Sequence, residues 1–234
     1  MILETMNLTC GYGKLPVLRD VNIHIGAESV ALIGPNGAGK TTLINAITGL
    51  VRPWGGSVLF DGRDLAGQAT HQIARAGIAL VPQERELFPG MTVADNLALG
   101  AAYIPRAQGQ EERLLDQVIR LFPILKERYR QIVGTMSGGQ QRMVAIARAL
   151  MANPKLLILD EPSLGLQPSI VSEVFDRLSE LKKDVAILVT EQNVKESLRS
   201  VDRGYVLENG VVVLEGAAAD LAKDPHVEAS YLGL

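Results

Sequence analysis

The residues with the clearest chemical potential form one glycine-rich segment directly after a short apolar run. The segment has the spacing Gly-x-x-x-x-Gly-Lys-Thr and reads Gly34-Pro35-Asn36-Gly37-Ala38-Gly39-Lys40-Thr41-Thr42. Glycines in this spacing let backbone N–H groups converge on phosphate oxygens, the lysine adds a point charge, and the threonine hydroxyl can hold Mg²⁺. A plain glycine turn is the alternative, but the apolar run before the segment and the helical spacing after it favour a phosphate site.

Two adjacent carboxylates, Asp160 and Glu161, follow another apolar run at residues 156–159. Alone, the pair would be an ordinary strand edge, and burying it is costly unless a cation or proton donor compensates it. Beside a phosphate loop, Asp160 can hold Mg²⁺ through water and Glu161 can activate a water molecule as general base. Gln83, which follows the apolar run at residues 78–81, can reach both the metal and the water. We expect these groups to meet, because ligands of open α/β sheets bind at the carboxyl ends of strands.

A third candidate is the run Ser137-Gly138-Gly139-Gln140, which directly precedes a stretch with helical apolar spacing. Ser137 can cap that helix, and the two glycines can expose backbone amides to an anion. A capped helix start without a ligand is the simpler interpretation of these four residues alone. The histidines predict no zinc site, because His24, His71 and His226 lack the spacing of metal ligands.

Short apolar runs define the elements that would position these residues. We predict two antiparallel strands at residues 2–8 and 17–25, and buried parallel strands at residues 29–33, 78–81, 156–159 and 185–190. Runs without alternation indicate a parallel sheet covered on both faces by helices. The pair Asn209-Gly210 predicts a hairpin with a two-residue turn within residues 205–213. Between residues 84 and 153 helical periodicity takes over, which predicts a helical insertion into an α/β body.

Length and composition narrow the class of protein. The chain has 234 residues, which suits one large domain or two small ones, and 23 basic against 26 acidic residues give a net charge of −3. This balance lacks the basic clusters of nucleic-acid-binding proteins, so we expect no nucleic acid partner. Cys10 is the single cysteine, which excludes an internal disulfide. No apolar run approaches the roughly 18–20 residues of a membrane-spanning helix, and the first residues lack a secretion signal, so we expect a cytosolic protein.

Together these motifs resemble the ATP-binding subunits of ABC transporters over nearly the whole chain. One stretch resembles the signature motif of the family, with Met136 where leucine is usual. It reads Thr135-Met136-Ser137-Gly138-Gly139-Gln140-Gln141-Arg142. Tyr12 matches the aromatic residue on which adenine stacks, although alone it would be a packing residue at a strand end. Gln83 stands at the position of the family's Q-loop, and residues 87–97 resemble the segment that meets the membrane subunit.

The resemblance implies a fold and a set of site residues. It predicts one ABC ATPase domain over residues 1–234, an α/β P-loop NTPase of the RecA-like type with a mostly parallel sheet and N-terminal antiparallel strands. Residues 1–84 and 154–234 would form the catalytic core, and residues 85–153 a helical subdomain that carries the signature. ATP and Mg²⁺ would be the cofactors. ATP would contact Tyr12, residues 34–42, Gln83 and the signature, the metal would contact Thr41, Gln83 and Asp160, and Glu161 and Gln192 would act in catalysis.

The resemblance also implies partners. In this family the signature of one chain contacts the γ-phosphate held by a second copy or a paralogue, so that two chains close head to tail around two ATP molecules. Opening and closing would move two membrane permease subunits, and a periplasmic substrate-binding protein would take part indirectly. The chain would lie in the cytoplasm, on the inner face of the cell membrane.

Finer features point to a subfamily. Gln192 stands where the family has its switch histidine, and Gln167 where most members have an aspartate. Four runs are similar to the shorter ATPase of bacterial branched-chain amino acid importers, namely residues 161–166, 191–193, 203–210 and 230–233. This predicts import of leucine, isoleucine or valine. Importers of urea or amides, a lipid-type exporter and an ABC ATPase without a transport role are the alternatives, and a small-molecule kinase is a further class that would use the same phosphate loop.

Overall fold

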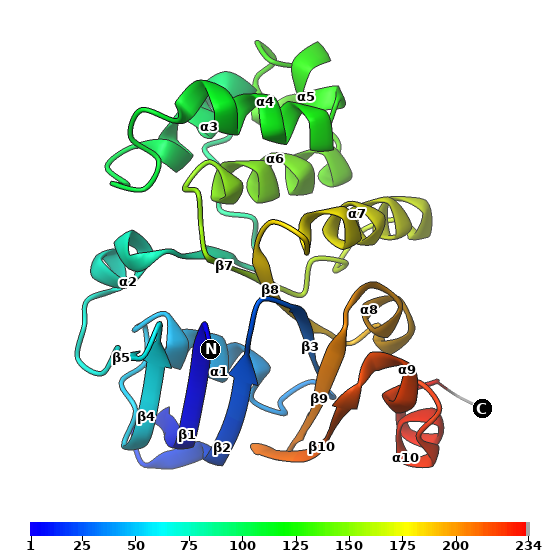
Figure 1. Ribbon diagram of the computed structural model, residues 1–234. Helices are drawn as coiled ribbons and strands as arrows, with labels where there is room; N and C mark the ends of the chain where they lie inside the picture. Colours follow the sequence, from blue (N-terminus) through cyan, green and yellow to red (C-terminus); the bar gives the residue numbers. More distant parts are fainter. Residues whose placement is uncertain (233–234) are drawn as a thin grey trace.

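The computed structural model describes residues 1–232 and contains two sheets with helices around them (Figure 1). One sheet has four strands in the order β2-β1-β4-β5, and the other has six in the order β10-β9-β3-β8-β7-β6. The strands are β1 (Leu3–Tyr12), β2 (Leu15–Ile25), β3 (Ser29–Ile33), β4 (Gly55–Phe60), β5 (Arg63–Asp64), β6 (Ile78–Val81), β7 (Leu156–Asp160), β8 (Ala186–Glu191), β9 (Arg203–Glu208) and β10 (Val211–Ala217). Gly233, the last residue of the run 230–233 quoted above, lies outside the described residues.

The six-stranded sheet is parallel except at β10, as predicted for the apolar runs. β6, β7, β8, β3 and β9 pair in parallel, and β3, β7 and β8 are buried along their whole length. The register places Asp160 beside Thr190 and Ile33 beside Glu191. The carboxyl ends of these strands therefore meet at one edge of the sheet, which brings the segments that follow them together.

The two faces of this sheet are covered differently. Leu157 and Leu159 of β7 point to a core shared with the helices of residues 93–150 and of the C-terminal third. Leu156 and Ile158 point to a second core shared with α1 (Lys40–Ile47) and with the N-terminal sheet. Ile73 of α2 (Thr70–Ala76) also lies in this second core, so helices cover both faces as predicted, and the N-terminal sheet covers the second face together with them. Successive side chains of β7 point to opposite faces of the sheet, and both faces are buried in a core. This explains why the apolar run of β7 is uninterrupted.

The helices are α1 (Lys40–Ile47), α2 (Thr70–Ala76), α3 (Val93–Ala101), α4 (Glu111–Leu121), α5 (Ile124–Glu127), α6 (Gly138–Leu150), α7 (Pro168–Leu181), α8 (Val194–Ser200), α9 (Ala218–Leu221) and α10 (Pro225–Val227), with short turns η1 (Val133–Thr135) and η2 (Glu228–Leu232). Helices α3 to α6 lie together at the top of Figure 1, away from the four-stranded sheet, and all fall within residues 85–153. The exact division at residues 84/85 and 153/154 stays a prediction. No helix within residues 1–232 combines the length and the apolar character required to cross a membrane.

The N-terminal sheet confirms one prediction and adds to another. β1 and β2 pair antiparallel, as their sequence predicts. β4 also pairs antiparallel with β1, and neither β4 nor β5 was predicted. At the other end of the chain β9 and β10 form the predicted hairpin, and its turn residues Asn209 and Gly210 both have positive φ, of 48° and 80°. Positive φ at both positions is the requirement of a type I′ turn.

Candidate functional site

The glycine-rich segment connects β3 to α1 at the carboxyl edge of the six-stranded sheet. Gly39 has a φ of 109°, and a Cβ at this position would lie 2.7 Å from the Leu18 side chain, so glycine is required where the loop turns into the helix. The first turn of α1 carries no acidic residue. Its backbone N–H groups and the positive end of the helix are thus free to attract an anion.

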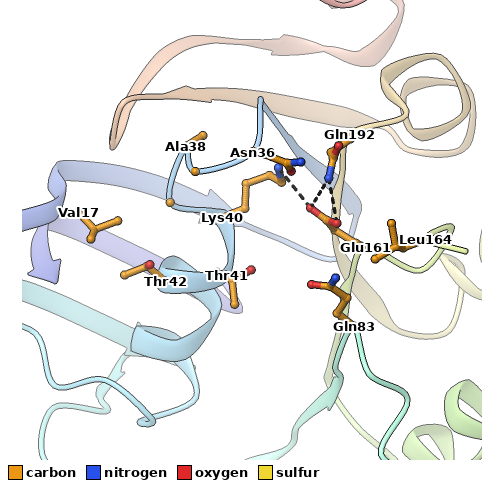
Figure 2. A pocket seen from close by; sticks show the side chains of 12 residues that line it. Val17, Asn36, Ala38, Lys40, Thr41, Thr42, Gln83, Glu161, Leu164 and Gln192 are labelled. Carbon is orange, nitrogen blue, oxygen red and sulfur yellow. Dashed lines mark hydrogen bonds and ion pairs between the residues drawn. The ribbon is translucent and has the colours of Figure 1, made fainter. Parts of the chain in front are cut away.

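Lys40 is the central cation of the site. Its side chain is 3% exposed, and its Nζ donates hydrogen bonds to the carbonyl oxygens of Gly34 and Pro35 over 2.8 and 3.2 Å. The same Nζ lies 3.4 Å from Oε1 of Glu161 (Figure 2). The loop therefore holds the ammonium group from one side, and the carboxylate that follows β7 holds it from the other.

A cavity of about 570 Å³ opens in front of this pair. That volume lies in the range of small-molecule binding sites. It is lined by Val17, Asn36, Gly37, Ala38, Gly39, Lys40, Thr41, Thr42, Gln83, Glu161, Leu164 and Gln192. Figure 2 shows Thr41 and Gln83 pointing from opposite sides toward the space beside Glu161. The structure thus brings the loop, the end of β6, the end of β7 and the segment after β8 around one hollow.

The two carboxylates after β7 have different surroundings. Asp160 is buried, accepts a hydrogen bond from Thr190 Oγ1 over 2.6 Å and does not border the cavity. Glu161 borders the cavity, has a positive φ of 46°, and donates its backbone N–H to the carbonyl and hydroxyl oxygens of Thr190 over 3.0 and 3.2 Å. Gln192 donates its side-chain amide to both carboxylate oxygens of Glu161. Thr190 therefore fixes the carboxylate of Asp160 and the backbone of Glu161, and Gln192 and Lys40 fix the carboxylate of Glu161.

A third carboxylate, Glu191, ends β8 directly before Gln192 and does not line the cavity. Its oxygens accept hydrogen bonds from the backbone N–H and the hydroxyl of Ser163, both over 2.8 Å. Burial raises the pKa of the Glu191 carboxyl above its ordinary value, although these hydrogen bonds from Ser163 act to lower it. Glu191 thus ties the segment after β7 to the end of β8.

The donor set suits Mg²⁺ better than a transition metal. Within residues 1–232 there is no group of three or more His, Cys, Asp or Glu side chains arranged for a metal. Mg²⁺ prefers oxygen ligands and is commonly held by one or two carboxylates together with substrate phosphates. The hydroxyl of Thr41, the amide oxygen of Gln83 and the carboxylate of Asp160 are oxygen ligands of this kind. The residues present therefore fit the predicted ion.

The remaining predicted residues lie outside this cavity. Tyr12 ends β1 with a half-exposed ring, its hydroxyl accepts a hydrogen bond from Asn45 over 3.2 Å, and it does not line the cavity. Ser137 caps α6 by accepting from the Gln140 backbone over 3.3 Å, and Gln140 returns the contact by accepting from the Ser137 backbone over 3.2 Å. Neither Ser137 nor residues 138–140 line the cavity. Within one chain the signature and the phosphate loop thus form separate surfaces.

Besides Ser163 and Glu191, four residues at or behind the site were not predicted. Val17 and Leu164 line the cavity, Thr190 supports both carboxylates, and Arg142 donates to the carbonyl oxygens of Pro82 and Gln83. The arginine offered a signal, because it is a charged residue at the start of the stretch with helical apolar spacing that follows residues 137–140. Val17, Leu164 and Thr190 offered none, since apolar residues and threonines of this kind are common in loops and strands.

The family comparison agrees with this geometry. The model of the ABC transporter family matches residues 18–164. The branched-chain amino acid transport ATP-binding protein BraG of Pseudomonas aeruginosa is 45% identical over 95% of each chain. The probable branched-chain amino acid transport ATP-binding protein LivF of Archaeoglobus fulgidus is 34% identical over 100% of this chain and 99% of its own. The lipopolysaccharide export system ATP-binding protein LptB of Acidithiobacillus ferridurans is 34% identical over 99% of this chain and 97% of its own.

Solved structures agree as well. The ADP conformation of an ATP-binding cassette of an ABC transporter is similar with a TM-score of 0.82 and 32% identity over 100% of this chain and 99% of that one. A dimeric ATP-binding cassette bound to ADP and phosphate is similar with a TM-score of 0.80 and 26% identity over 93% and 99% of the two chains. The fold, the phosphate loop and these matches lead to one conclusion: the chain belongs to the ABC transporter family and is an ATPase with its P-loop NTPase fold.

Proposed function

We propose that this ATPase drives the import of leucine, isoleucine and valine through separate membrane subunits. The observation that carries the proposal is the 45% identity to the branched-chain amino acid transport protein BraG over 95% of both chains. The similarity to LivF, which is also named as a branched-chain amino acid transport protein, supports the proposal over the full length of this chain. The switch position also agrees, because Gln192 is one of the features that the sequence shares with the shorter ATPase of such importers.

The cavity supports specific roles for its residues. Lys40 and the backbone N–H groups of residues 36–41 would bind the phosphates of ATP, because they combine a buried ammonium group with the positive end of α1. Glu161 would accept a proton from the attacking water, and Gln192 would orient its carboxylate. Thr41, Gln83 and Asp160 would hold Mg²⁺, which when bound neutralises charge on the phosphates. Asp160 contacts Thr190 here, so its part would be exerted through water.

The signature supports the proposal of a paired ATPase. Ser137 is exposed at the start of α6, and residues 137–140 do not line the cavity of their own chain. A second ATPase chain, identical or paralogous, would present these residues to the γ-phosphate in a head-to-tail dimer. The similarity to a dimeric cassette bound to ADP and phosphate supports this arrangement. Tyr12, half-exposed beside α1, would stack on the adenine.

The assembled transporter would contain two such ATPases and two membrane permease subunits. The ATPases would lie on the cytoplasmic face of the cell membrane, and a periplasmic substrate-binding protein would deliver the amino acid. A lipid exporter is the second candidate function. The 34% identity to LptB over nearly both full chains supports it, but that value is lower than the 45% identity to BraG.

Uptake measurements in the source organism test the substrate. We expect deletion of the gene to abolish high-affinity uptake of radiolabelled leucine, isoleucine and valine, with uptake of urea and acetamide unchanged. Wild-type protein should restore uptake, and Glu161→Gln should not. Unchanged uptake of all three amino acids together with loss of lipopolysaccharide from the cell surface would support the lipid exporter instead. Loss of urea or acetamide uptake alone would assign the chain to that importer class.

A further inference from the structure

Arg142 is the largest fully buried side chain in the described part of the molecule. It lies in the second turn of α6, five residues after Ser137, and its side chain is 0% exposed. A buried cation is strongly unfavourable unless hydrogen bonds and opposite charges compensate it. The position therefore requires an explanation beyond the packing of α6.

The guanidinium group is held by backbone oxygens of another element. One terminal nitrogen donates to the carbonyl oxygen of Pro82 over 3.0 Å, and the other donates to that of Gln83 over 2.9 Å. Nε of Arg142 has no hydrogen-bond partner among residues 1–232. The planar fork of an arginine suits two neighbouring carbonyl oxygens, whereas the single ammonium group of a lysine would not span them equally.

The charge of this arginine persists in its buried position. Burial lowers the pKa of the Arg142 guanidinium to about 10, and the nearby Arg85 lowers it as well, whereas Glu191, Asp160 and Glu84 raise it. A value near 10 leaves the group protonated at neutral pH. The positive charge is thus placed within the field of the carboxylates at the ends of β7 and β8.

The segment that Arg142 holds needs external support. β6 ends at Val81, and two residues farther on Gln83 lines the ATP cavity. Arg85 and Glu86 then adopt φ values of 47° and 46°, a conformation that residues with a side chain rarely take. Positive φ at two consecutive residues persists when the surroundings fix it. The contacts from α6 supply this fixation, since Gln141 accepts a hydrogen bond from the Arg85 side chain over 3.1 Å.

We propose that Arg142 is a positioning residue of the ATP site, which fixes the backbone at Pro82 and Gln83 so that the Gln83 amide faces the cavity. The same contact ties Gln83 to the helix that Ser137 caps. A shift of the signature helix would therefore displace Gln83 directly, without passing through the six-stranded sheet. This inference rests on the proposed role of Gln83 as a ligand of Mg²⁺ and of the attacking water.

A double-mutant cycle on the purified full-length chain tests the proposal through ATP hydrolysis. We expect Arg142→Met to lower kcat about 10- to 100-fold, since misplacing a metal ligand has effects of this size. The Mg²⁺ concentration for half-maximal rate should rise by a similar factor, and KM for ATP should change less. In a Gln83→Ala background, Arg142→Met should lower kcat by about twofold or less, because the side chain that it positions is absent.

Two controls separate positioning from folding. Arg148→Met removes another arginine from α6, a partly buried one that donates to the Arg85 backbone over 3.4 Å and has no hydrogen bond to Gln83. We expect it to leave the Mg²⁺ dependence unchanged. Arg142→Lys retains the charge and one hydrogen bond, so it should recover part of the lost rate. If Arg142→Met does not fold, the rate and the Mg²⁺ dependence of Arg142→Lys test the proposal in its place.

The proposal fails under any of three results. The first is a folded Arg142→Met or Arg142→Lys variant with wild-type rate and Mg²⁺ dependence. The second is an effect of Arg142→Met that is equally large in the Gln83→Ala background. The third is a Gln83→Ala variant with full activity, which removes the group that Arg142 would position. None of these results bears on the transported solute, which the uptake measurements address separately.

Discussion

Gln192 donates its side-chain amide to both carboxylate oxygens of Glu161, over 3.2 Å to Oε1 and 3.1 Å to Oε2. Lys40 lies 3.4 Å from Oε1 of the same carboxylate. Glu161 is thus held between a cation from the phosphate loop and a neutral donor from the segment after β8. This arrangement orients the carboxylate toward the cavity in the absence of any partner chain, and it makes the contributions of the two residues separable by mutation.

Replacement of Glu161 by glutamine tests its role as general base. We expect Glu161→Gln to bind ATP and to hydrolyse it about 10²- to 10⁴-fold more slowly, because the amide cannot accept a proton. Trapped ATP should also prolong the closed dimer, which light scattering in the presence of ATP and Mg²⁺ would detect. Phosphate release and equilibrium dialysis measure turnover and binding separately. Hydrolysis at wild-type rate would show that another group is the base.

A histidine at position 192 should change the pH profile. The carboxamide of Gln192 does not titrate near neutral pH, whereas an imidazole does, so Gln192→His introduces a titration step beside Glu161. We expect kcat of this variant to change between pH 6 and 8 in a way that wild type does not show. Gln192→Ala, which loses both hydrogen bonds, should lower kcat about tenfold at every pH in this range. Identical profiles for wild type and the histidine variant would contradict a direct contact between residue 192 and the reacting groups.

A substitution in the signature, Ser137→Arg, should impair ATP turnover by the dimer and spare ATP binding by the monomer. Ser137→Arg places a large cation on an exposed helix start that does not line the ATP cavity of its own chain. We expect ATP binding by the monomer to change by about twofold or less, while turnover falls by at least about 100-fold. Thr92→Arg is the matched control, because Thr92 caps α3 through the same kind of reciprocal contact with Asp95. Equal loss of binding and turnover in the Ser137→Arg monomer would contradict the cross-chain assignment.

Much of the site was predictable because its groups lie next to strong local signals. The phosphate loop is one continuous motif, and Asp160 and Glu161 directly follow an apolar run. Parallel strands bring their carboxyl ends to one edge, so Gln83 could be placed beside both from the strand ends alone. The Asn209-Gly210 turn was equally local, since two adjacent residues determine it.

The unpredicted features depend on packing between distant segments. Thr190 meets Asp160 because the register of β7 and β8 places them side by side, and no local pattern records that register. β4 begins with two glycines and has no clear alternation, so its pairing with β1 had no sequence signal. The N-terminal sheet shares the second face of β7 with α1 and α2, and this contact between distant segments had no local sequence signal either. Arg142 was visible as a charged residue at the start of an amphipathic stretch, but its hydrogen-bond partners Pro82 and Gln83 were not.

The buried carboxyl of Glu191 should make stability depend on pH. Burial raises its pKa above the ordinary value, so between the unfolded and folded pKa values the folded state binds the proton more readily. The contribution of this group is therefore complete below the unfolded pKa of about 4.3 and is lost as the pH rises through the folded pKa. Urea unfolding from pH 4 to 7 should show wild type losing stability relative to Glu191→Gln as the pH rises. A constant difference between the two would contradict the shift, and Glu173→Gln on the exposed face of α7 controls for the loss of one charge.

Gly210 joins the β9–β10 hairpin to the phosphate loop. Its backbone N–H donates to the Ala38 carbonyl oxygen over 3.0 Å, and its own carbonyl accepts from the Arg19 backbone over 2.9 Å. Its φ is 80°, and a Cβ at this position would collide with the backbone carbonyl of Val17.

We expect Gly210→Ala to move the hairpin away from β2 and the loop, to lower the free energy of unfolding by about 2 kcal/mol or more, and to weaken ATP binding. Two causes contribute at position 210, namely the strain of a positive φ and the collision with Val17. Gly62→Ala separates them, because Gly62 has a φ of 73° and a Cβ there would have no other atom within 4 Å. This control therefore reports the strain of positive φ alone. Urea unfolding and equilibrium dialysis of ATP should show a larger effect on both quantities at position 210, and equal effects at the two positions would contradict the expected displacement of the hairpin.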